Sequence, residues 1–297
     1  MQFKAIVAVL VLGLMALLPL KWAQGIGSFI GRRAYKKPQG DLCRITRINT
    51  DLCFPELSQD EKEQLIQASL KETGKSICEM GMSWLWSPKR TLKKVVTIDN
   101  ESLIVDALAN EKGVILIAPH LGNWEVLNLY LSNKYEFTAM YRPPKLKLLD
   151  DLVKKMRARL GTRMAPADAS GVRIVMKALK RGEMVGILPD QEPSTGGDFA
   201  PFFGHPAYSM KLLPQLVRQT GAKVVCGYAE RLPNAAGFHI HFIEPDEALY
   251  SKDLEVALAG MNASVEKCVR ALPEQYQWEY KRFNNQPEGL VRPYRRK

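Results

Sequence analysis

The sequence predicts an α/β fold in which a largely parallel sheet is flanked by helices. From Val95 onward, strand-like segments alternate with helix-like segments, which is the pattern of β-α-β units. The strand-like segments are near-continuous apolar runs such as VILIA at 114–118, as expected for strands buried on both faces. At 297 residues, the chain is long enough to bury a large core.

The order of elements follows from these runs and the turn residues between them. The expected strands are 114–118, 137–141, 184–188, 223–228 and 238–243. The expected helices are 102–111, 124–131, 146–160, 171–181, 210–220 and 254–272. No internal repeat or low-complexity segment interrupts this order.

Residues 1–31 carry the pattern of a membrane-anchoring helix. The stretch AIVAVLVLGLMALLPL at 5–20 has no charge, but a helix of this length reaches only ~24 Å of the ~30 Å hydrocarbon core. Extension through Ile30, with Lys21 reaching toward the surface, gives sufficient length. A cleaved signal peptide is the alternative, although Lys4 is the only upstream charge and no clean A-x-A site follows.

The segment after the anchor is basic and contains Arg32, Arg33, Lys36 and Lys37. Basic flanks remain in the cytoplasm, so residues 32–297 are expected to form a single cytoplasmic domain. The same charges would attract anionic phospholipid headgroups. Residues 32–41 are expected to be a linker, 38–55 a mixed segment, and 56–86 two helices, the first with the capping-box spacing of Ser58 and Glu61.

Charge and cysteine usage narrow the classes of function. The net charge of +11 favours an anionic partner, which could be nucleic acid, an acidic protein or a phospholipid surface. The five cysteines are scattered and form no C-x-x-C pair. This argues against a disulfide framework or a zinc site and favours a reducing compartment.

The stretch GVILIAPHLGNWEVLNLYL at 113–131 places a histidine and a carboxylate between a strand and a helix. Ligands bind beyond the carboxyl ends of strands in open parallel sheets, and His120 follows such an end. Asn123 is a good N-cap, which places Glu125 in the first helical turn, where the dipole favours a carboxylate. We expect Glu125 to orient the His120 ring and leave its other nitrogen basic. A structural histidine is the alternative that this spacing leaves open.

Two other histidines have the same spacing to a carboxylate, namely His239 to Glu244 and His241 to Asp246. They share one face of the alternating segment FHIHFI, and we interpret them as structural or solvent-facing. His205 lies in a turn without such a partner.

An ordered set of motifs resembles a known family. APHLGNWE at 118–125 resembles the His-x4-Asp/Glu motif of the lysophospholipid acyltransferase superfamily, and its Gly-Asn-Trp-Glu form resembles the bacterial lipid A late acyltransferases. MYRPPK, MRARLGTR, ALKRGEMVGILPDQEPSTGGDFAPFFG and PEQYQWEYKRF resemble later segments of that branch, in the same order. One departure is FNNQPEG, where that family usually has a basic Thr-Arg-Pro segment.

The resemblance implies a glycerolipid acyltransferase-like fold and an acyl transfer reaction. An acyl chain would move from acyl carrier protein to a 3-hydroxyl on an acyl chain of a lipid A precursor at the bacterial inner membrane. His120 would be the general base and Glu125 its orienting carboxylate. Substrate-binding candidates implied by the resemblance are Arg142, Arg157, Arg159 and Asp190. No metal or cofactor is expected.

Two further segments are expected to contact the substrates or the carrier protein. The loop containing FAPFFG could lie beside an acyl channel, or its phenylalanines could pack in the core. A basic neighbourhood is expected to contact the acidic carrier protein or the phosphates of the acceptor. Its members are Lys145, Lys147, Lys154, Lys155, Arg157, Arg159 and Arg163.

Other functions remain as alternatives at this stage. A lysophospholipid or glycerophosphate acyltransferase would share the base, but its usual Glu-Gly-Thr-Arg block is replaced here by PDQEPSTGG. An acyl thioesterase would use His120 to activate water. A nucleic-acid-binding protein is disfavoured because no helix-turn-helix pattern or aromatic RNA-binding box is found. A metalloenzyme is disfavoured because no H-E-x-x-H or His/Cys cluster is found.

Overall fold

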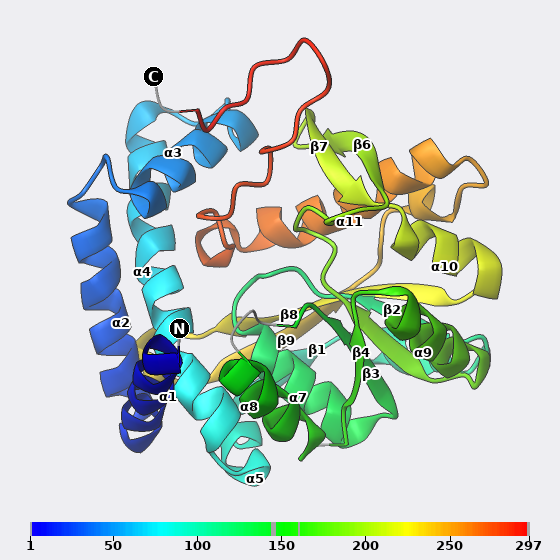
Figure 1. Cartoon of the computed structure of the whole chain (residues 1–297), viewed down its shortest axis with the longest axis horizontal. Coiled ribbons are helices and arrows are strands. Elements are labelled where there is room, and N and C mark those ends of the chain that lie inside the picture. The colour runs from blue at the N-terminus through cyan, green and yellow to red at the C-terminus, as the bar shows by residue number, and fades with distance from the viewer. Residues whose placement is uncertain (1, 144–146, 160, 296–297) are drawn as a thin grey trace.

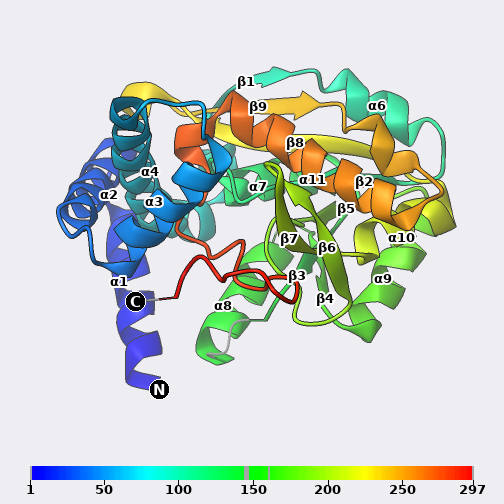
Figure 2. The ribbon, with the colours of Figure 1, turned by 90° about the horizontal axis from the view of Figure 1, so that it is seen from above.

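A seven-stranded sheet with the strand order β1-β9-β8-β2-β5-β3-β4 forms the centre of the molecule in the computed structural model (Figures 1 and 2). The structure describes residues 2–143, 147–159 and 161–295, with only the backbone at 2–5 and 147–149. All neighbouring strands are parallel except β8 and β9. The strands are β1 (Val95–Asp99), β2 (Val114–Ile117), β3 (Phe137–Tyr141), β4 (Arg163–Pro166), β5 (Met184–Ile187), β8 (Lys223–Arg231) and β9 (Phe238–Ile243).

The two faces of the sheet are covered by different helices. Alternate residues of β2 point to opposite faces and so contact different sets of helices. Ile115 and Ile117 point into a core shared with α9 (Ala169–Lys180), α10 (Leu212–Thr220) and α11 (Leu254–Ala271). Val114 and Leu116 point into a core shared with α6 (Ser102–Leu108) and α7 (Trp124–Lys134). All four residues of β2 are buried, which explains its continuous apolar run. The predicted α/β class with a largely parallel sheet is therefore confirmed.

The five predicted strands and six predicted helices all form, with small differences at their ends; the helix expected at 146–160 is α8 (Lys147–Ala158). Four strands were not predicted. β1 and β4 are the two edge strands and lack a continuous apolar run. β6 (Gly197–Phe202) and β7 (His205–Met210) form a separate antiparallel hairpin, although each contains a proline.

The N-terminal segment forms two helices, so the prediction of one anchoring helix through residue 31 is wrong. α1 (Gln2–Leu17) and α2 (Leu20–Tyr35) are separated at Pro19, which has an extended backbone and cannot donate a helical hydrogen bond. None of the helices in the described part of the chain has both the length and the apolar character needed to cross a membrane.

Helix α2 packs closely along α4 (Gln59–Leu85) instead of leaving the domain (Figure 1). The close approach depends on facing glycines: a Cβ added to Gly27 would lie 2.4 Å from the carbonyl oxygen of Gly74. The N-terminal helices therefore share an interface with the body of the protein.

The expected linker at 32–41 is half helical: α2 continues to Tyr35 and α3 (Asp41–Cys53) begins at Asp41, so only residues 36–40 connect the two helices. Residues 59–85 form one long helix, α4, and the prediction of two helices there is wrong. Its glycines permit helix contacts without ending it. The capping box of Ser58 and Glu61 at its start is confirmed. The remaining α-helix in the described part of the chain is the short α5 (Pro88–Leu92).

Candidate active site

Two side chains meet where neighbouring parallel strands end. His120 follows β2 and Asp190 follows β5, and these strands pair in parallel. The Nδ1 atom of His120 lies 3.0 Å from Oδ1 of Asp190, and the backbone N–H of His120 donates to Oδ2 at 3.0 Å. One carboxylate therefore holds both the ring and the backbone of His120. The carboxyl ends of adjacent strands are where an open α/β sheet places ligands.

The protonation of this pair follows from its surroundings. Asp190 is buried, and burial alone would raise its pKa, but the charge of His120 and the hydrogen bonds from His120 outweigh burial and lower the pKa below its usual value. An ionised carboxylate can only accept hydrogen bonds, so Nδ1 of His120 carries the proton. Nε2 has no hydrogen-bond partner among the described residues, and it is the nitrogen left with a basic lone pair.

The contact between Glu125 and His120 that the sequence predicts is not formed in the described structure. No hydrogen bond joins these two residues in the described structure, and Asp190 occupies the position expected for Glu125. The carboxylate of Glu125 instead forms a two-point ion pair with the guanidinium of Arg157, including an Nε–Oε2 distance of 3.3 Å. Glu125 does lie in the first turn of α7, as predicted, but the carboxylate points toward α8. Spacing along the chain could not distinguish these two directions.

The corner between β2 and α7 depends on two residues. Gly122 has a φ of +62°, and a Cβ there would lie 2.0 Å from the carbonyl oxygen of Ala229. Only glycine fits this backbone beside β8. Asn123 accepts a hydrogen bond from the backbone N–H of Val126 at 3.0 Å, which confirms the predicted N-cap.

A buried network fixes the same corner to α4. Asn123 Nδ2 donates to Glu79 Oε2 at 2.9 Å, and Glu79 pairs with Arg231 at 2.5 Å. Arg231 also pairs with Glu72 at 2.8 Å. Burial disfavours the charge on Arg231, but Glu79 and Glu72 more than compensate and raise its pKa. Removing one partner of such a pair typically costs ~3–5 kcal/mol, so this network holds the corner rigidly in place.

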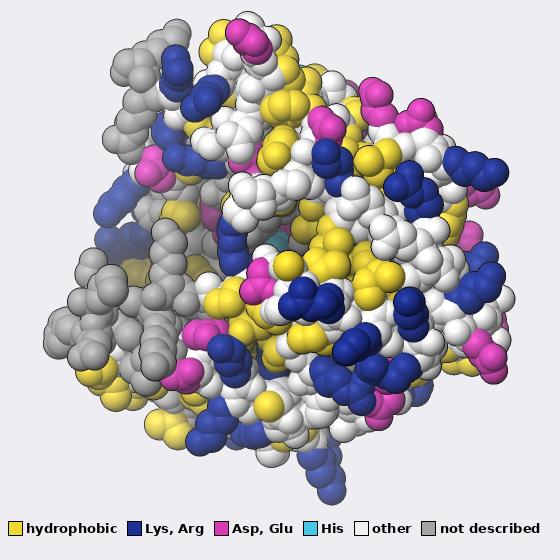
Figure 3. Space-filling model, turned by 45° about the vertical axis from the view of Figure 1, so that its right-hand side comes forward, with side chains coloured by type: hydrophobic (Ala, Val, Ile, Leu, Met, Phe, Trp, Pro, Cys, Tyr) yellow, Lys and Arg dark blue, Asp and Glu magenta, His cyan; other side chains and the backbone are white. Residues whose placement is uncertain are grey.

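His120 lines a cavity of about 650 Å³. This volume lies in the range of small-molecule sites. Trp84 and Trp124 line it, and Leu188 and Met210 add apolar surface. The ring of Trp124 contacts His120 edge-on, with centroids 5.1 Å apart. Figure 3 shows a hollowed face on which apolar side chains are bordered by many lysine and arginine side chains.

The cavity contains two tryptophans that sequence reasoning did not select. No motif in the sequence singles out Trp84, and Trp124 enters only as part of APHLGNWE. The indole N–H of Trp84 is buried and has no hydrogen-bond partner in the described structure. The position of Trp124 four residues after His120, within the same motif, is the sequence feature that could have indicated its place in the cavity.

The three candidate arginines have different positions. Arg142 follows β3, lines the cavity and has no polar partner among the described residues. Arg157 lines the cavity while paired with Glu125. Arg159 does not line the cavity; its Nη2 donates to the carbonyl oxygen of Trp86 at 2.8 Å and so satisfies the end of α4.

The expected basic neighbourhood is partly neutralised within the chain. Lys154 pairs with Asp150, and Arg163 pairs with both Glu136 and Glu183. Lys145 and the side chain of Lys147 lie outside the described part of the chain. The contribution of this region to anion binding is therefore smaller than its composition indicates.

The FAPFFG segment follows the core-packing alternative. Phe202 and Phe203 are buried, and Phe203 contacts Phe54 and Trp278 edge-on. The residues before the hairpin, Ser194 through Gly196, do line the cavity.

Known proteins of one family resemble this chain over most of its length. The family model described as "Bacterial lipid A biosynthesis acyltransferase" matches residues 2–285. The chain belongs to this family. The resemblance found in the motifs is thereby confirmed.

Several curated members of the family are similar over most of their length. The chain is 29% identical to the lipid A biosynthesis lauroyltransferase of Escherichia coli (strain K12), over 96% of this chain and 92% of that protein. It is 30% identical to the palmitoleoyltransferase of the same organism, over 82% and 79%. It is 26% identical to the corresponding myristoyltransferase, over 95% and 87%. These family members are named for different acyl chains, so membership alone does not select one chain length.

Proposed function

We propose that this protein transfers a fatty acyl chain from acyl carrier protein to a 3-hydroxyl on an acyl chain of a lipid A precursor. The observation that carries this proposal is the His120–Asp190 pair beside an apolar-lined cavity, in a chain that belongs to the lipid A acyltransferase family. The pair supplies a base, and the cavity supplies a place for an acyl chain. Together they fit acyl transfer to a hydroxyl better than a purely structural histidine.

His120 acts as general base in this mechanism. Its Nε2 removes the proton from the acceptor hydroxyl as the oxygen attacks the thioester carbonyl carbon. The tetrahedral intermediate then collapses, the C–S bond breaks, and the thiol leaves with the proton from Nε2. Asp190 stabilises the imidazolium through the bond from Nδ1–H, at 3.0 Å.

Arg157 and Arg142 bind the anionic parts of the substrates in this proposal. The Glu125–Arg157 pair fixes one guanidinium at the cavity wall, so Glu125 is a positioning residue. Arg142 is an unpaired cation at the cavity among the described residues, which suits a phosphate of the acceptor or of the carrier's prosthetic group. Arg159 contributes by holding α8 against α4.

The N-terminal helices bind the inner membrane on its cytoplasmic side, without requiring a spanning segment. Their exposed apolar side chains form an N-terminal apolar surface, in which Leu17 is 80% and Trp22 is 68% exposed. Arg32 and Arg33 lie in the last turn of α2, where they suit anionic headgroups. The full surface comprises Ile6, Val7, Leu10, Val11, Leu14, Leu17, Trp22, Ile26, Phe29 and Ile30.

Membrane binding is tested by sedimentation with vesicles that contain anionic phospholipid. The double variant Leu14→Glu/Leu17→Glu is expected to remain in the supernatant when wild-type protein sediments. Val105→Glu is the matched control, because Val105 is an exposed apolar residue on α6, outside this surface. Equal sedimentation of all three proteins would contradict the proposed surface.

The reaction is tested with purified protein, acyl carrier protein loaded with a labelled fatty acid, and a lipid A precursor. The proposal expects the label on the precursor by mass spectrometry, with none after His120→Ala. Label on glycerol 3-phosphate or a lysophospholipid instead would support the glycerolipid alternative. Free fatty acid formed at the rate of transfer, without an acceptor, would support a thioesterase.

A further inference from the structure

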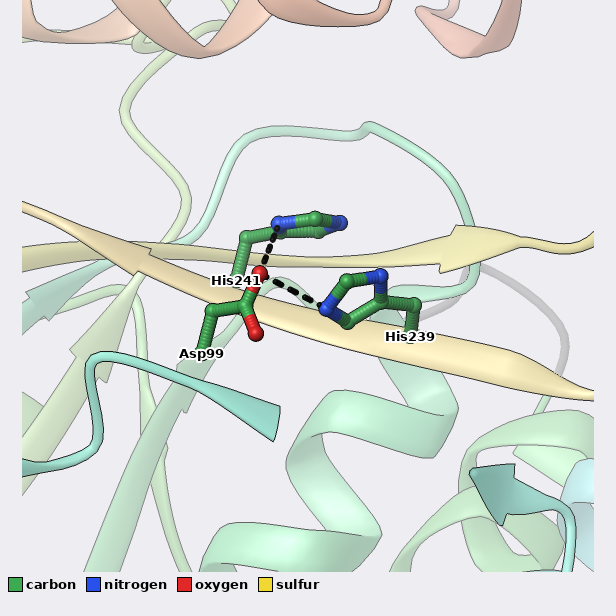
Figure 4. Close-up of side chains that lie close together, drawn as sticks. All are labelled: Asp99, His239 and His241. Carbon is green, nitrogen blue, oxygen red and sulfur yellow. Dashed lines mark ion pairs between the residues drawn. The ribbon is translucent and has the colours of Figure 1, made fainter. Parts of the chain in front are cut away.

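Three potential metal ligands lie together on the two outermost strands at one edge of the sheet (Figure 4). Asp99 ends β1 and pairs directly with His241 on β9, and His239 lies two residues earlier on the same face of β9. One nitrogen from each ring and one carboxylate oxygen all lie within 4.8 Å of one another. In the part of the chain that the structure describes, this is the one such group of three.

The contacts within this cluster are close but poorly satisfied as hydrogen bonds. Nε2 of His239 lies 2.8 Å from Oδ2 of Asp99, yet this nitrogen is buried and has no hydrogen-bond partner of suitable geometry. Nδ1 of His241 lies 3.5 Å from the same oxygen. Two ring nitrogens and one carboxylate oxygen thus converge without the bonds that would normally explain such proximity.

The other nitrogen of His241 has the partner expected behind a metal ligand. Its Nε2 lies 2.8 Å from Oε2 of Glu230 on β8. An ionised carboxylate accepts, so Nε2 carries a proton and directs the Nδ1 lone pair toward Asp99. Carboxylate–histidine–metal arrangements of this kind fix the tautomer of the ligating ring. A lone pair that faces a carboxylate is unfavourable unless a proton or a metal ion lies between them.

A metal ion can contact both ring nitrogens and the carboxylate at once, whereas protonating both rings would place two charges side by side. The rings of His239 and His241 have centroids only 3.8 Å apart, so two imidazolium charges would repel at close range. Zinc–ligand bonds of ~2.0–2.1 Å in a tetrahedron place ligands ~3.3 Å apart. The two nitrogen–oxygen distances of 2.8 and 3.5 Å lie on either side of that separation.

We propose that Asp99, His239 and His241 bind a divalent first-row transition metal ion of the zinc class. Two imidazoles and one carboxylate are a typical donor set for such ions. Asp99 is 47% exposed, so the site opens to solvent and water completes the coordination. Because β1 is an edge strand, the ion fastens it to β9. The site does not include any residue that lines the His120 cavity, so its role is structural and independent of acyl transfer.

The test is isothermal titration of untagged, chelator-treated full-length protein with ZnCl2 alone. Wild-type protein is expected to bind about one equivalent, and Co2+ in its place should give the visible absorption of a four-coordinate ion. Asp99→Asn and His239→Ala/His241→Ala should abolish this binding. Glu230→Gln should weaken it about 10–100-fold, because it removes only the carboxylate behind His241.

His120→Ala separates this site from the other histidine–carboxylate pair. It is expected to bind zinc as wild-type protein does. The proposal is overturned if wild-type protein shows no saturable binding, if binding persists in Asp99→Asn, or if binding disappears in His120→Ala. Asp99→Asn keeps the test valid if the histidine variant does not fold, because this half-exposed side chain is replaced by one of similar shape.

Discussion

Replacing Asp190 by asparagine tests whether Asp190 is the carboxylate that orients the His120 ring for its proposed role as general base. Asparagine has nearly the same shape as aspartate, and its oxygen can still accept a hydrogen bond from the backbone N–H of His120. In the wild-type protein this N–H lies 3.0 Å from Oδ2 of Asp190. The amide NH2 group would face Nδ1, which lies 3.0 Å from Oδ1. Two donors cannot pair, so the ring would move its proton to Nε2 and lose the basic lone pair required at the substrate.

The size of the expected effect follows from the lost interaction. A hydrogen bond to a charged group contributes ~1.5–3 kcal/mol, and each 1.36 kcal/mol corresponds to a tenfold change in rate. Loss of charge alone therefore lowers kcat about ten- to 150-fold. The wrong tautomer lowers it further, toward the ~10⁴-fold loss seen for the equivalent change in a serine protease triad. KM for the donor should change little, because Asp190 is buried behind the ring.

The assay is acyl transfer from labelled acyl carrier protein under saturating donor and acceptor. Asp198→Asn is the matched control, since this aspartate is exposed on β6 and pairs only loosely with Lys211, at 3.6 Å. It should retain near wild-type turnover. Near wild-type kcat for Asp190→Asn, with a normal melting curve, would refute the assignment of Asp190 as the orienting carboxylate.

Three other predictions concern charged side chains at the cavity. Glu125→Gln and Arg157→Gln should each reduce the rate of acyl transfer at least about tenfold. The double variant should be no less active than the poorer single variant, because the two residues act as one unit. Additive losses in the double-mutant cycle would contradict this. Arg142→Gln should raise KM for the acceptor or donor with a smaller change in kcat, and an unchanged KM for both substrates would remove it from binding. The pKa of Asp190 is lower in the folded protein than in the unfolded chain, where it is about 4. The ionised carboxylate therefore stabilises the fold above about pH 4. This stabilisation is lost as the pH falls through the pKa of the folded state. Urea unfolding should show the stability difference between wild-type protein and Asp190→Asn shrinking below about pH 4, and a constant difference would contradict the shift.

The central strands could be predicted because a strand that is buried on both faces has apolar residues at every position. VILI at 114–117 and MVGI at 184–187 are apolar throughout, and both form fully buried strands. The edge strand Val95–Asp99 is partly exposed and carries no such mark. The apolar pattern does not reveal the break at Pro19, because it continues on both sides of this residue.

The position of His120 could be predicted, but the carboxylate that it contacts could not. His120 follows a strand end within a recognisable strand–turn–helix corner, and the position of this corner is local information. The Asp190 partnership depends on β2 and β5 being neighbours, although 70 residues separate the two side chains in the chain. Similarly, the direction of Glu125 is decided by Arg157 on α8, which spacing within the motif does not reveal. The Asp99–His239–His241 cluster depends on the pairing of β1 with β9, two strands separated by most of the domain sequence.

The state of the His120 ring tests the account most directly. Nitrogen-15 NMR distinguishes the two neutral tautomers of a histidine, and comparison with His120→Ala assigns the signal among the four histidines. The His120–Asp190 bond predicts a proton on Nδ1 and a bare Nε2 in the neutral ring of the free protein. A neutral ring protonated on Nε2 would contradict the proposed base.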